Sequence, residues 1–322
     1  MNTIVKILLG IFIFISCLAI GIIVWIAIVL LIRKLAVENA LLNKLGCGEY
    51  YCEPETIDLP IPEYTDSCSM EIARYCTDLI LRVEKKTENE YKAPNNLTKE
   101  LDLYIRKDSP VFGMVWSYIN DGKKFIYVVY RGTLNYRDWI EDFSYNQNPF
   151  PTKKSLEEQQ KVTFLQDTEI IPNVHNGFLE SYKNFRNELI ENLKETKPHA
   201  IIITGHSLGA AVATLCGLDI IKLGCCNNTI VYNFASPRVG DNIFANLVDT
   251  NLTLYRFVNT CDFIPTLPPS VCPNFDNPEN PYMYEHCGKI IQFTSNWKSI
   301  VNNHLLNAYI TFLDLKTPKT YI

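Results

Sequence analysis

The sequence lacks any strong imbalance of charge. It has 30 lysines and arginines against 35 aspartates and glutamates, a formal net charge of -5, and no long block of either sign. Nothing therefore favours a nucleic-acid partner or a charged tail. Internal repeats and low-complexity tracts are also missing, which argues against a solenoid or an extended linker protein. The composition of the 322 residues as a whole, 47% hydrophobic and 20% charged, is typical of a folded globular chain.

Charged residues are absent from one long N-terminal segment, residues 7–32, which is almost wholly apolar. About 20 apolar residues cross a bilayer as a helix. The apolar core of a cleaved signal peptide is shorter, at roughly 7–15 residues, and is followed by a small-residue cleavage site that we do not find here. We expect a single-pass transmembrane helix (a signal-anchor) within residues 1–34, rather than a cleaved signal or a core helix. A connector over 35–60, with several Pro and Gly, and a folded domain over 61–322 would follow.

Two signals disagree about the side of the membrane on which this domain lies. Lys6 precedes the span, whereas Arg33, Lys34 and Lys44 follow it, and this count favours a cytosolic domain. An even number of cysteines outside the span favours disulfides and an oxidising compartment, with free buried thiols as the alternative. On the cysteines we expect a lumenal or extracellular domain. They are Cys47, Cys52, Cys68, Cys76, Cys216, Cys225, Cys226, Cys261, Cys272 and Cys287.

Three N-glycosylation sequons begin at Asn96, Asn227 and Asn251. Chance alone gives a similar number in a chain so rich in asparagine, so the sequons do not decide the orientation. A glycoprotein is the expectation that accompanies a lumenal domain.

Beyond the connector, strand and helix patterns alternate, which predicts an α/β architecture with a largely parallel sheet. Asp66 is a candidate cap for a helix whose apolar positions run from Ile72 to Val83, and the polar residues 87–109 are expected to be loops. Asn120-Asp121-Gly122 predicts a hairpin turn. Strands are expected at 111–119, 125–130, 200–204, 230–234 and 252–258, and helices at 178–193 and 208–222.

The segment Gly205-His206-Ser207-Leu208-Gly209 matches the G-x-S-x-G nucleophile elbow. The pattern alone is weak, and a helix-capping serine between two glycines is the alternative. Its context strengthens it, because a buried strand leads directly into it and an Ala-rich helix leads out. We therefore predict that Ser207 is the nucleophile of an ester hydrolase, held in strained backbone geometry above the sheet.

A serine hydroxyl needs a base to remove its proton, and the chain has only five histidines. In this fold the acid and then the histidine follow the serine, which leaves His286 and His304 as bases. His206 adjoins the serine, so its ring should point away from the attack side. Asp262 follows a predicted strand at the sheet edge where ligands gather, and is the candidate acid. Asp241 and Asp276 are weaker candidates.

The oxyanion of an ester-cleaving enzyme needs hydrogen-bond donors that are already in place. We expect one donor to be the amide of Leu208, directly after the nucleophile. The second is predicted at Thr133, after the strand that ends in Tyr130-Arg131-Gly132, with a plain β-turn as the alternative.

From about Val111 to its C-terminus the chain resembles the class 3 lipases, the fungal triacylglycerol lipase type. The matching motifs are Tyr130-Arg131-Gly132-Thr133, Asp138-Trp139-Ile140-Glu141-Asp142, Val174-His175-Asn176-Gly177-Phe178, Thr204 to Ala210, Ser236 to Asp241 and Phe257 to Pro265. The resemblance implies an α/β-hydrolase fold, a Ser207–Asp262–His304 triad and Thr133 as an oxyanion residue. His304 is preferred to His286 because Asn303-His304-Leu305-Leu306 resembles the family's histidine segment, although family members often have Asp where this chain has Asn303.

The resemblance also implies a lid, with Trp139, Ile140 and Phe143 as its apolar face; a fixed surface helix is the alternative. Residues 142–174 are longer than in the fungal enzymes. The favoured activity is that of a lipase acting on acylglycerol esters through an acyl-enzyme, without a metal or organic cofactor. A phospholipase or acyltransferase on the same fold, and a catalytically inactive lipid-binding module at the membrane, are the alternatives. No protein partner follows from the sequence.

Overall fold

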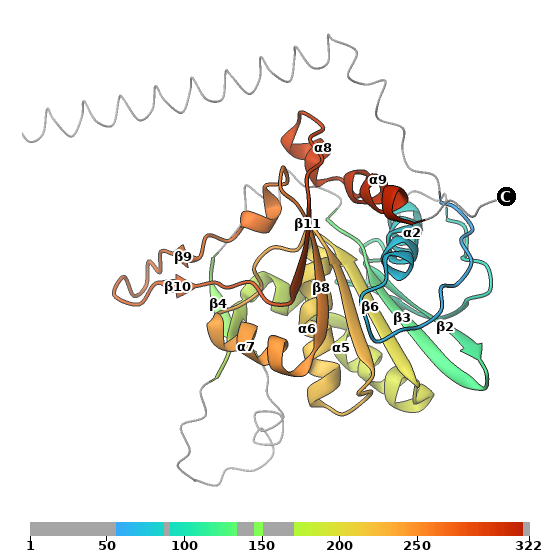
Figure 1. The fold of residues 1–322 in the computed structure, drawn as a ribbon. Helices are drawn as coiled ribbons and strands as arrows, with labels where there is room; N and C mark the ends of the chain where they lie inside the picture. The colour runs from blue at the N-terminus through green and yellow to red at the C-terminus, as the bar shows by residue number, and fades with distance from the viewer. Residues whose placement is uncertain (1–55, 87–90, 134–144, 151–170, 318–322) are drawn as a thin grey trace, which may run out of the picture. The chain divides into compact units, whose positions relative to one another are not determined.

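The computed structural model describes residues 56–86, 91–133, 145–150 and 171–317 (Figure 1). The apolar segment 7–32, the connector to residue 55 and the predicted lid residues Trp139, Ile140 and Phe143 lie outside these ranges. Within them, no helix is both long and apolar enough to cross a membrane.

A seven-stranded sheet organises the domain, in the order β1-β2-β3-β6-β7-β8-β11. The strands from β3 to β11 run parallel, and β1 and β2 join them as an antiparallel edge, so the predicted largely parallel sheet is confirmed. Its strands are β1 (Thr98–Leu103), β2 (Gly113–Asn120), β3 (Lys123–Tyr130), β6 (Ala200–His206), β7 (Thr229–Phe234), β8 (Thr253–Asn259) and β11 (Lys289–Phe293).

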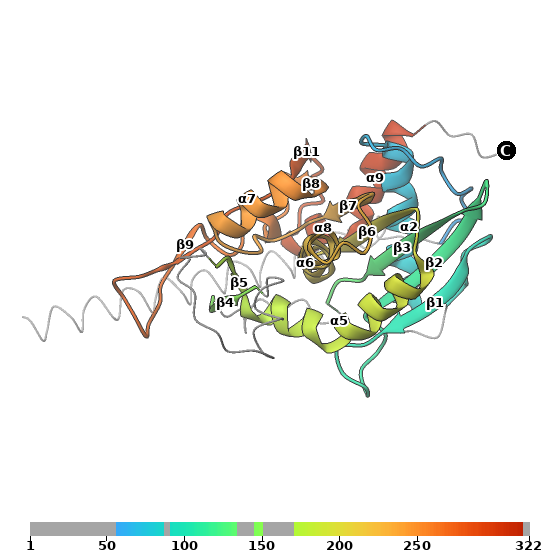
Figure 2. The same cartoon turned by 90° about the horizontal axis from the view of Figure 1, so that it is seen from below.

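Helices cover both faces of this sheet, and each face has its own apolar core. On one face lie α5 (Asn176–Thr196), α6 (Leu208–Lys222) and α7 (Asn242–Asn251). On the other lie α2 (Met70–Lys86) and α9 (Leu306–Lys316), side by side (Figures 1 and 2). Strand β6 contributes Ile201 and Ile203 to the first core and Ile202 to the second. Because both faces of this strand are buried, its sequence is a continuous apolar run.

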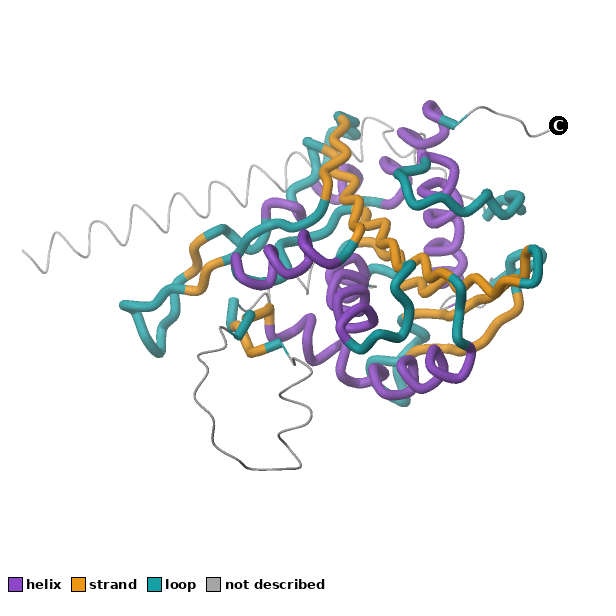
Figure 3. The backbone as a smooth tube through the Cα atoms, turned by 60° about the horizontal axis from the view of Figure 1, so that its bottom comes forward, coloured by secondary structure: helices purple, strands orange, loops and turns teal. Residues whose placement is uncertain are grey.

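The remaining elements are short and lie at the rim of the sheet. A two-stranded hairpin, β9 (Val271–Cys272) with β10 (Tyr282–Met283), extends away from the sheet (Figure 3). Strand β4 (Gln147–Pro149) pairs with β5 (Asn173–His175). The turn η2 (Ile264–Thr266) and helix α8 (Ile300–His304) lie close to the carboxyl ends of the parallel strands (Figure 1).

The hairpin predicted at Asn120-Asp121-Gly122 is confirmed, since β2 and β3 pair across it and both Asp121 and Gly122 have positive φ. Two local expectations are wrong. The cap of α2 is Ser69, whose Oγ accepts from the Ile72 amide at 3.2 Å, and not Asp66. The predicted loop 87–109 contains strand β1, in which charged residues occupy a sheet edge.

The expected disulfides are not found among the described cysteines. Eight of the ten cysteines outside the apolar segment are described, and all eight are free thiols. For these eight the expectation is wrong, and Cys47 and Cys52 lie outside the described residues. Five of them are buried, and four of these, Cys76, Cys216, Cys226 and Cys287, lie in the two apolar cores.

Candidate active site

Ser207 lies in the sharp turn between β6 and α6, with φ 57° and ψ -121°. An L-residue rarely adopts this conformation, so the surrounding packing must hold it there. A side chain at Gly205 would collide with the Gly209 backbone, and one at Gly209 would collide with the backbone of Tyr130 and Arg131. The two glycines are therefore what allows strand, helix and neighbouring loop to approach at this turn.

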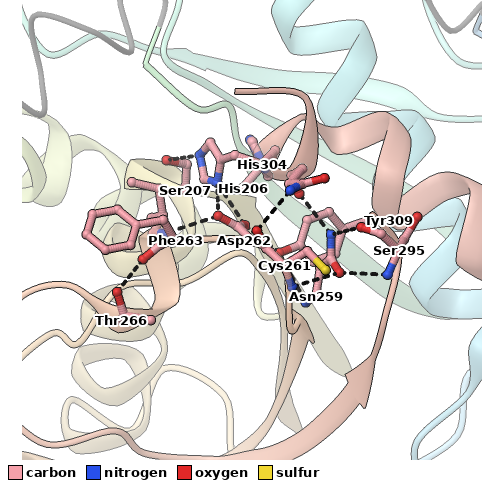
Figure 4. Close-up of polar contacts among 12 residues, drawn as sticks. His206, Ser207, Asn259, Cys261, Asp262, Phe263, Thr266, Ser295, His304 and Tyr309 are labelled. Carbon is pink, nitrogen blue, oxygen red and sulfur yellow. Dashed lines mark hydrogen bonds and ion pairs between the residues drawn. The ribbon is translucent and has the colours of Figure 1, made fainter. Parts of the chain in front are cut away.

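His304 brings an imidazole to the serine from the end of α8. Its Nε2 lies 2.9 Å from Ser207 Oγ, and its Nδ1 lies 2.9 and 3.0 Å from the two carboxylate oxygens of Asp262 (Figure 4). All three side chains are at least 95% buried. Asp262 sits just beyond β8, as the sequence predicted. The three predicted residues thus meet in the order serine, histidine, aspartate, although His304 is 97 residues from Ser207 in the chain.

The Asp262 carboxylate has two further partners. The hydroxyl of Tyr309, on α9, donates to Oδ2 at 2.7 Å, and the Ile264 amide donates to Oδ1 at 2.9 Å (Figure 4). These bonds fix the carboxylate plane facing His304. Sequence analysis did not identify Tyr309, because no motif marks a tyrosine five residues after the histidine.

His206 is buried between the turn and the histidine. Its Nε2 donates to the main-chain oxygen of His304 at 2.8 Å, rather than bonding Ser207 Oγ, and the two imidazole centroids are 4.7 Å apart. Burial, and to a lesser degree the neighbouring His304, lowers the pKa of His206 to about 3. This ring is therefore neutral at working pH and carries its proton on Nε2.

The loop after β3 passes directly beside the nucleophile. A side chain at Gly132 would lie 3.6 Å from Ser207 Cβ, so the main chain of Gly132 borders the site, and Thr133 is the next residue in the chain. Arg131 fixes this loop, because its guanidinium donates to the main-chain oxygens of Val111 and Gly132, each at 2.7 Å. Leu208 begins α6, so its amide lies at the positive end of that helix.

The alternative candidates lie elsewhere. Asp241 caps α7 by accepting from the Phe244 amide at 2.8 Å. Asp276 is exposed in the β9–β10 hairpin. His286 donates to the Pro265 oxygen at 2.7 Å, and burial lowers its pKa to about 3. His175 caps α5. None of these residues forms a hydrogen bond with Ser207 in the described part of the chain.

Two buried asparagines surround the acid and the histidine, and the sequence predicted a role for neither side chain. Asn259 ends β8, and Asn303 precedes His304. The Asn259 amide donates to the main-chain oxygens of Asn303, at 3.0 Å, and Ser295, at 2.8 Å (Figure 4). No sequence signal distinguishes Asn259 from the many other asparagines in the chain, and Asn303 is marked only by its place before the histidine. Among the described residues there is no cluster of three or more metal-ligating side chains.

Comparison with known proteins gives a consistent result. The family model for lipase (class 3) matches residues 127–272. A lipase of Rhizomucor miehei is 35% identical over 158 residues, covering 47% of this chain and 39% of that lipase. The secreted mono- and diacylglycerol lipase A of Penicillium camembertii is 31% identical over 148 residues, covering 44% of this chain and 43% of that lipase. The aligned segment therefore spans less than half the length of these curated relatives.

Solved structures agree over a larger part of the fold. The Rhizomucor miehei triacylglyceride lipase aligns with a TM-score of 0.50 and 27% identity, covering 71% of this chain and 83% of that one. Another structure with the same values is described as a triacylglycerol lipase whose catalytic centre is a serine protease triad.

Fold and site together define an α/β hydrolase with a Ser–His–Asp arrangement at the carboxyl edge of its sheet. Within that class, residues 127–272 are similar to the class 3 lipases.

Proposed function

We propose that this protein hydrolyses carboxylic esters of lipids through an acyl-enzyme formed on Ser207. The observation that carries the proposal is the 2.9 Å separation of Ser207 Oγ and His304 Nε2, with Asp262 bonded to the opposite ring nitrogen. A serine becomes nucleophilic when a positioned base can take its proton as it attacks. The similarity of residues 127–272 to the class 3 lipases supports the same reaction.

Each residue then has a distinct step. His304 accepts the Ser207 proton while the hydroxyl oxygen attacks the ester carbonyl, and Asp262 stabilises the resulting imidazolium. The amides of Leu208 and Thr133 bind the oxyanion of the tetrahedral intermediate. Collapse of that intermediate forms the acyl-enzyme, and His304 returns its proton to the leaving alcohol. Water repeats the attack, with His304 again as the base, and releases the fatty acid.

We propose acylglycerols as the substrate class, because the relatives above are named as lipases of triacylglycerols or of mono- and diacylglycerols. The direct test is turnover by the full chain in detergent micelles, on a short-chain ester and on emulsified triacylglycerol and diacylglycerol. Activity that disappears in Ser207→Ala supports the proposal. Activity that survives this change refutes Ser207 as the nucleophile.

Product analysis separates the alternatives. Acyl transfer to an added alcohol in preference to water would identify a transferase, and release of fatty acid from phospholipid alone would identify a phospholipase. A folded wild type that turns over no ester, and that a fluorophosphonate does not label at Ser207, would point to an inactive lipid-binding module.

We also propose that residues 7–32 anchor the protein in a membrane, on the strength of their length and apolar character. Because the eight described cysteines are free, they no longer support a lumenal domain. The Lys and Arg count beside the span favours a cytosolic one. Asn96, Asn227 and Asn251 are all exposed. Whether they are glycosylated therefore shows directly on which side of the membrane the domain lies. A glycosidase-sensitive gel shift of the full chain, removed by Asn→Gln at these sites, would place the domain in the lumen.

A further inference from the structure

Arg131 holds the loop that leads to the predicted oxyanion donor Thr133. Its side chain is 6% exposed. Its Nε donates to the main-chain oxygen of Val111 at 2.7 Å, and its Nη1 donates to that of Gly132, also at 2.7 Å. Its own amide donates to the Phe112 oxygen at 3.0 Å. The loop after β3 is therefore held by three hydrogen bonds from one arginine.

One of these bonds determines where the Thr133 amide points. The Gly132 oxygen and the Thr133 N–H belong to one trans peptide unit, in which the two groups point in opposite directions. Because the oxygen points to the Arg131 guanidinium, the N–H points away from it. A side chain at Gly132 would come within 3.0 Å of His206 Nδ1 and 3.6 Å of Ser207 Cβ, so this peptide unit lies against the nucleophile.

The same bond makes the Thr133 amide a stronger donor. A guanidinium is charged, and charge-assisted hydrogen bonds are roughly twice as strong as neutral ones. A hydrogen bond to the carbonyl of a peptide polarises the whole unit, which strengthens its N–H as a donor. Burial lowers the pKa of Arg131, and the charge of Glu84 offsets only part of this effect. The charge of Arg131 is therefore weakly screened where it meets the peptide.

We propose that Arg131 is a positioning residue of the oxyanion hole, acting through the peptide unit that joins Gly132 to Thr133. It aims the Thr133 amide and strengthens its bond to the oxyanion of the tetrahedral intermediate. This role rests on the proposed function, since it concerns the same reaction. The ester oxygen becomes negative only as Ser207 attacks, so the contribution of Arg131 is made in the transition state and should appear in kcat.

A thionoester, in which sulfur replaces the carbonyl oxygen, separates this role from a merely structural one. Sulfur is a weak acceptor, so the anion formed on attack gains less from amide donors. In the full chain in detergent micelles, we expect Arg131→Met to lower kcat on a short-chain ester by about tenfold or more, with KM changed less than about twofold. On the matching thionoester kcat should fall less than about threefold. Arg131→Lys keeps a positive donor but not the planar fork that spans two oxygens, so it should recover part of the loss.

Arg238 provides a matched control, because its guanidinium also donates to two main-chain oxygens. Its Nη1 bonds the oxygens of Thr266 and Pro268, at 2.5 and 2.7 Å, and burial lowers its pKa as well. Neither oxygen belongs to a peptide unit that is predicted to bind the oxyanion. Whatever rate Arg238→Met loses, we expect its ratio of ester to thionoester rates to stay within about twofold of the wild type.

A second measurement does not require turnover. A trifluoromethyl ketone forms a hemiketal with a serine nucleophile: the Ser207 Oγ–carbon bond forms, the carbonyl π electrons move to the ketone oxygen, and His304 takes the serine proton. The pH midpoint at which this oxygen ionises, followed by its carbon-13 resonance, measures how well the site stabilises an oxyanion. A tenfold loss raises the midpoint by about one pH unit, and we expect this rise in Arg131→Met but not in Arg238→Met.

The two measurements separate the failure of this role from the failure of the proposed function. A wild type that forms the hemiketal but hydrolyses no ester would refute the proposed function and leave the hemiketal midpoint as the test of Arg131.

Three results would overturn the positioning role of Arg131. They are an equal loss on the ester and the thionoester in Arg131→Met, a hemiketal midpoint that does not rise, and an equally selective loss of the ester in Arg238→Met. If Arg131→Met does not fold, as judged by circular dichroism, Arg131→Lys decides the question. In that variant a wild-type ratio of ester to thionoester rates together with a wild-type midpoint refutes the proposal.

Discussion

At the scale of single residues, the backbone of Ser207 is held in a conformation with φ 57° that glycine adopts freely and other residues do not. Ser207→Gly and Ser207→Ala both remove the hydroxyl, so both should abolish hydrolysis. Because only glycine relieves the strain, we expect Ser207→Gly to be more stable than Ser207→Ala by about 1 kcal/mol. Urea unfolding of the two variants measures this difference, and equal midpoints would show that the turn is not strained.

His206 is the second residue whose role can be measured alone. Glutamine can place an amide donor near the position of Nε2, whereas leucine fills the space without a donor. We expect His206→Leu to lower kcat by about tenfold through loss of the bond to the His304 oxygen, and His206→Gln to recover much of it. Steady-state kinetics of both variants test this. Equal activity of the two would mean that the ring acts only by filling space.

The residue scale also shows what the sequence could predict of the site. Ser207 and Asp262 were located by their places at strand ends, and His304 by its resemblance to a family segment. The contacts of Tyr309, Asn259 and Asn303 were not predicted, because they join residues that are 42 to 50 positions apart in the chain. Such contacts have no local pattern, so only the three-dimensional structure identifies them.

At the scale of helices and strands, α5 and α6 are joined by a buried charged group. Arg186 donates to both carboxylate oxygens of Asp219, at 2.6 and 3.0 Å, and Tyr182 donates to the same carboxylate at 2.8 Å. Asp219 is 2% exposed. Removing the arginine leaves this carboxylate without its counter-charge, so Arg186→Met should destabilise the fold by about 3 kcal/mol.

The neighbouring pair Lys183–Glu180 on α5 provides the control for that prediction. Both of its side chains are about half exposed, at 46% and 54%, so Lys183→Met should cost less than about 0.5 kcal/mol. Denaturant unfolding of both variants gives the comparison. Similar losses in the two would contradict a special contribution from the buried group.

Strands were predicted where their burial is strong, and missed where it is weak. The apolar runs of β2, β3, β6, β7 and β8 lie in the interior of the sheet or against its cores, so their composition reveals them. The two edge strands, β1 and β11, are mostly exposed or half-buried and carry charged or mixed residues. An edge strand forms by pairing with a neighbouring strand of the sheet that is already in place. Its own sequence therefore gives little indication that it is a strand.

For the whole molecule, buried neutral histidines predict a loss of stability in acid. Burial is the main cause of a pKa of about 3 for both His206 and His286. Between pH 6.5 and about 3 the unfolded chain binds protons that the folded chain does not. Stability should therefore fall as pH falls through this window, by up to roughly 1.4 kcal/mol per pH unit for each histidine.

Urea unfolding between pH 7 and pH 5 measures this slope. The double variant His206→Gln, His286→Gln should show a flatter dependence than the wild type, because it lacks both sites of proton uptake. The same slope in both proteins would show that other groups govern the acid sensitivity.

The pairing of α2 with α9 determines when the molecule becomes functional during its synthesis. Arg74 on α2 bonds Asp314 on α9 at 2.6 Å, and both helices contribute to one apolar core. A ribosome makes α2 first among the described helices and α9 last, so that core cannot close until nearly all of the described chain has emerged. His304 and Tyr309 arrive with the same final segment. On the proposed mechanism, a nascent chain therefore carries its nucleophile in an unactivated form until translation of the described domain is complete.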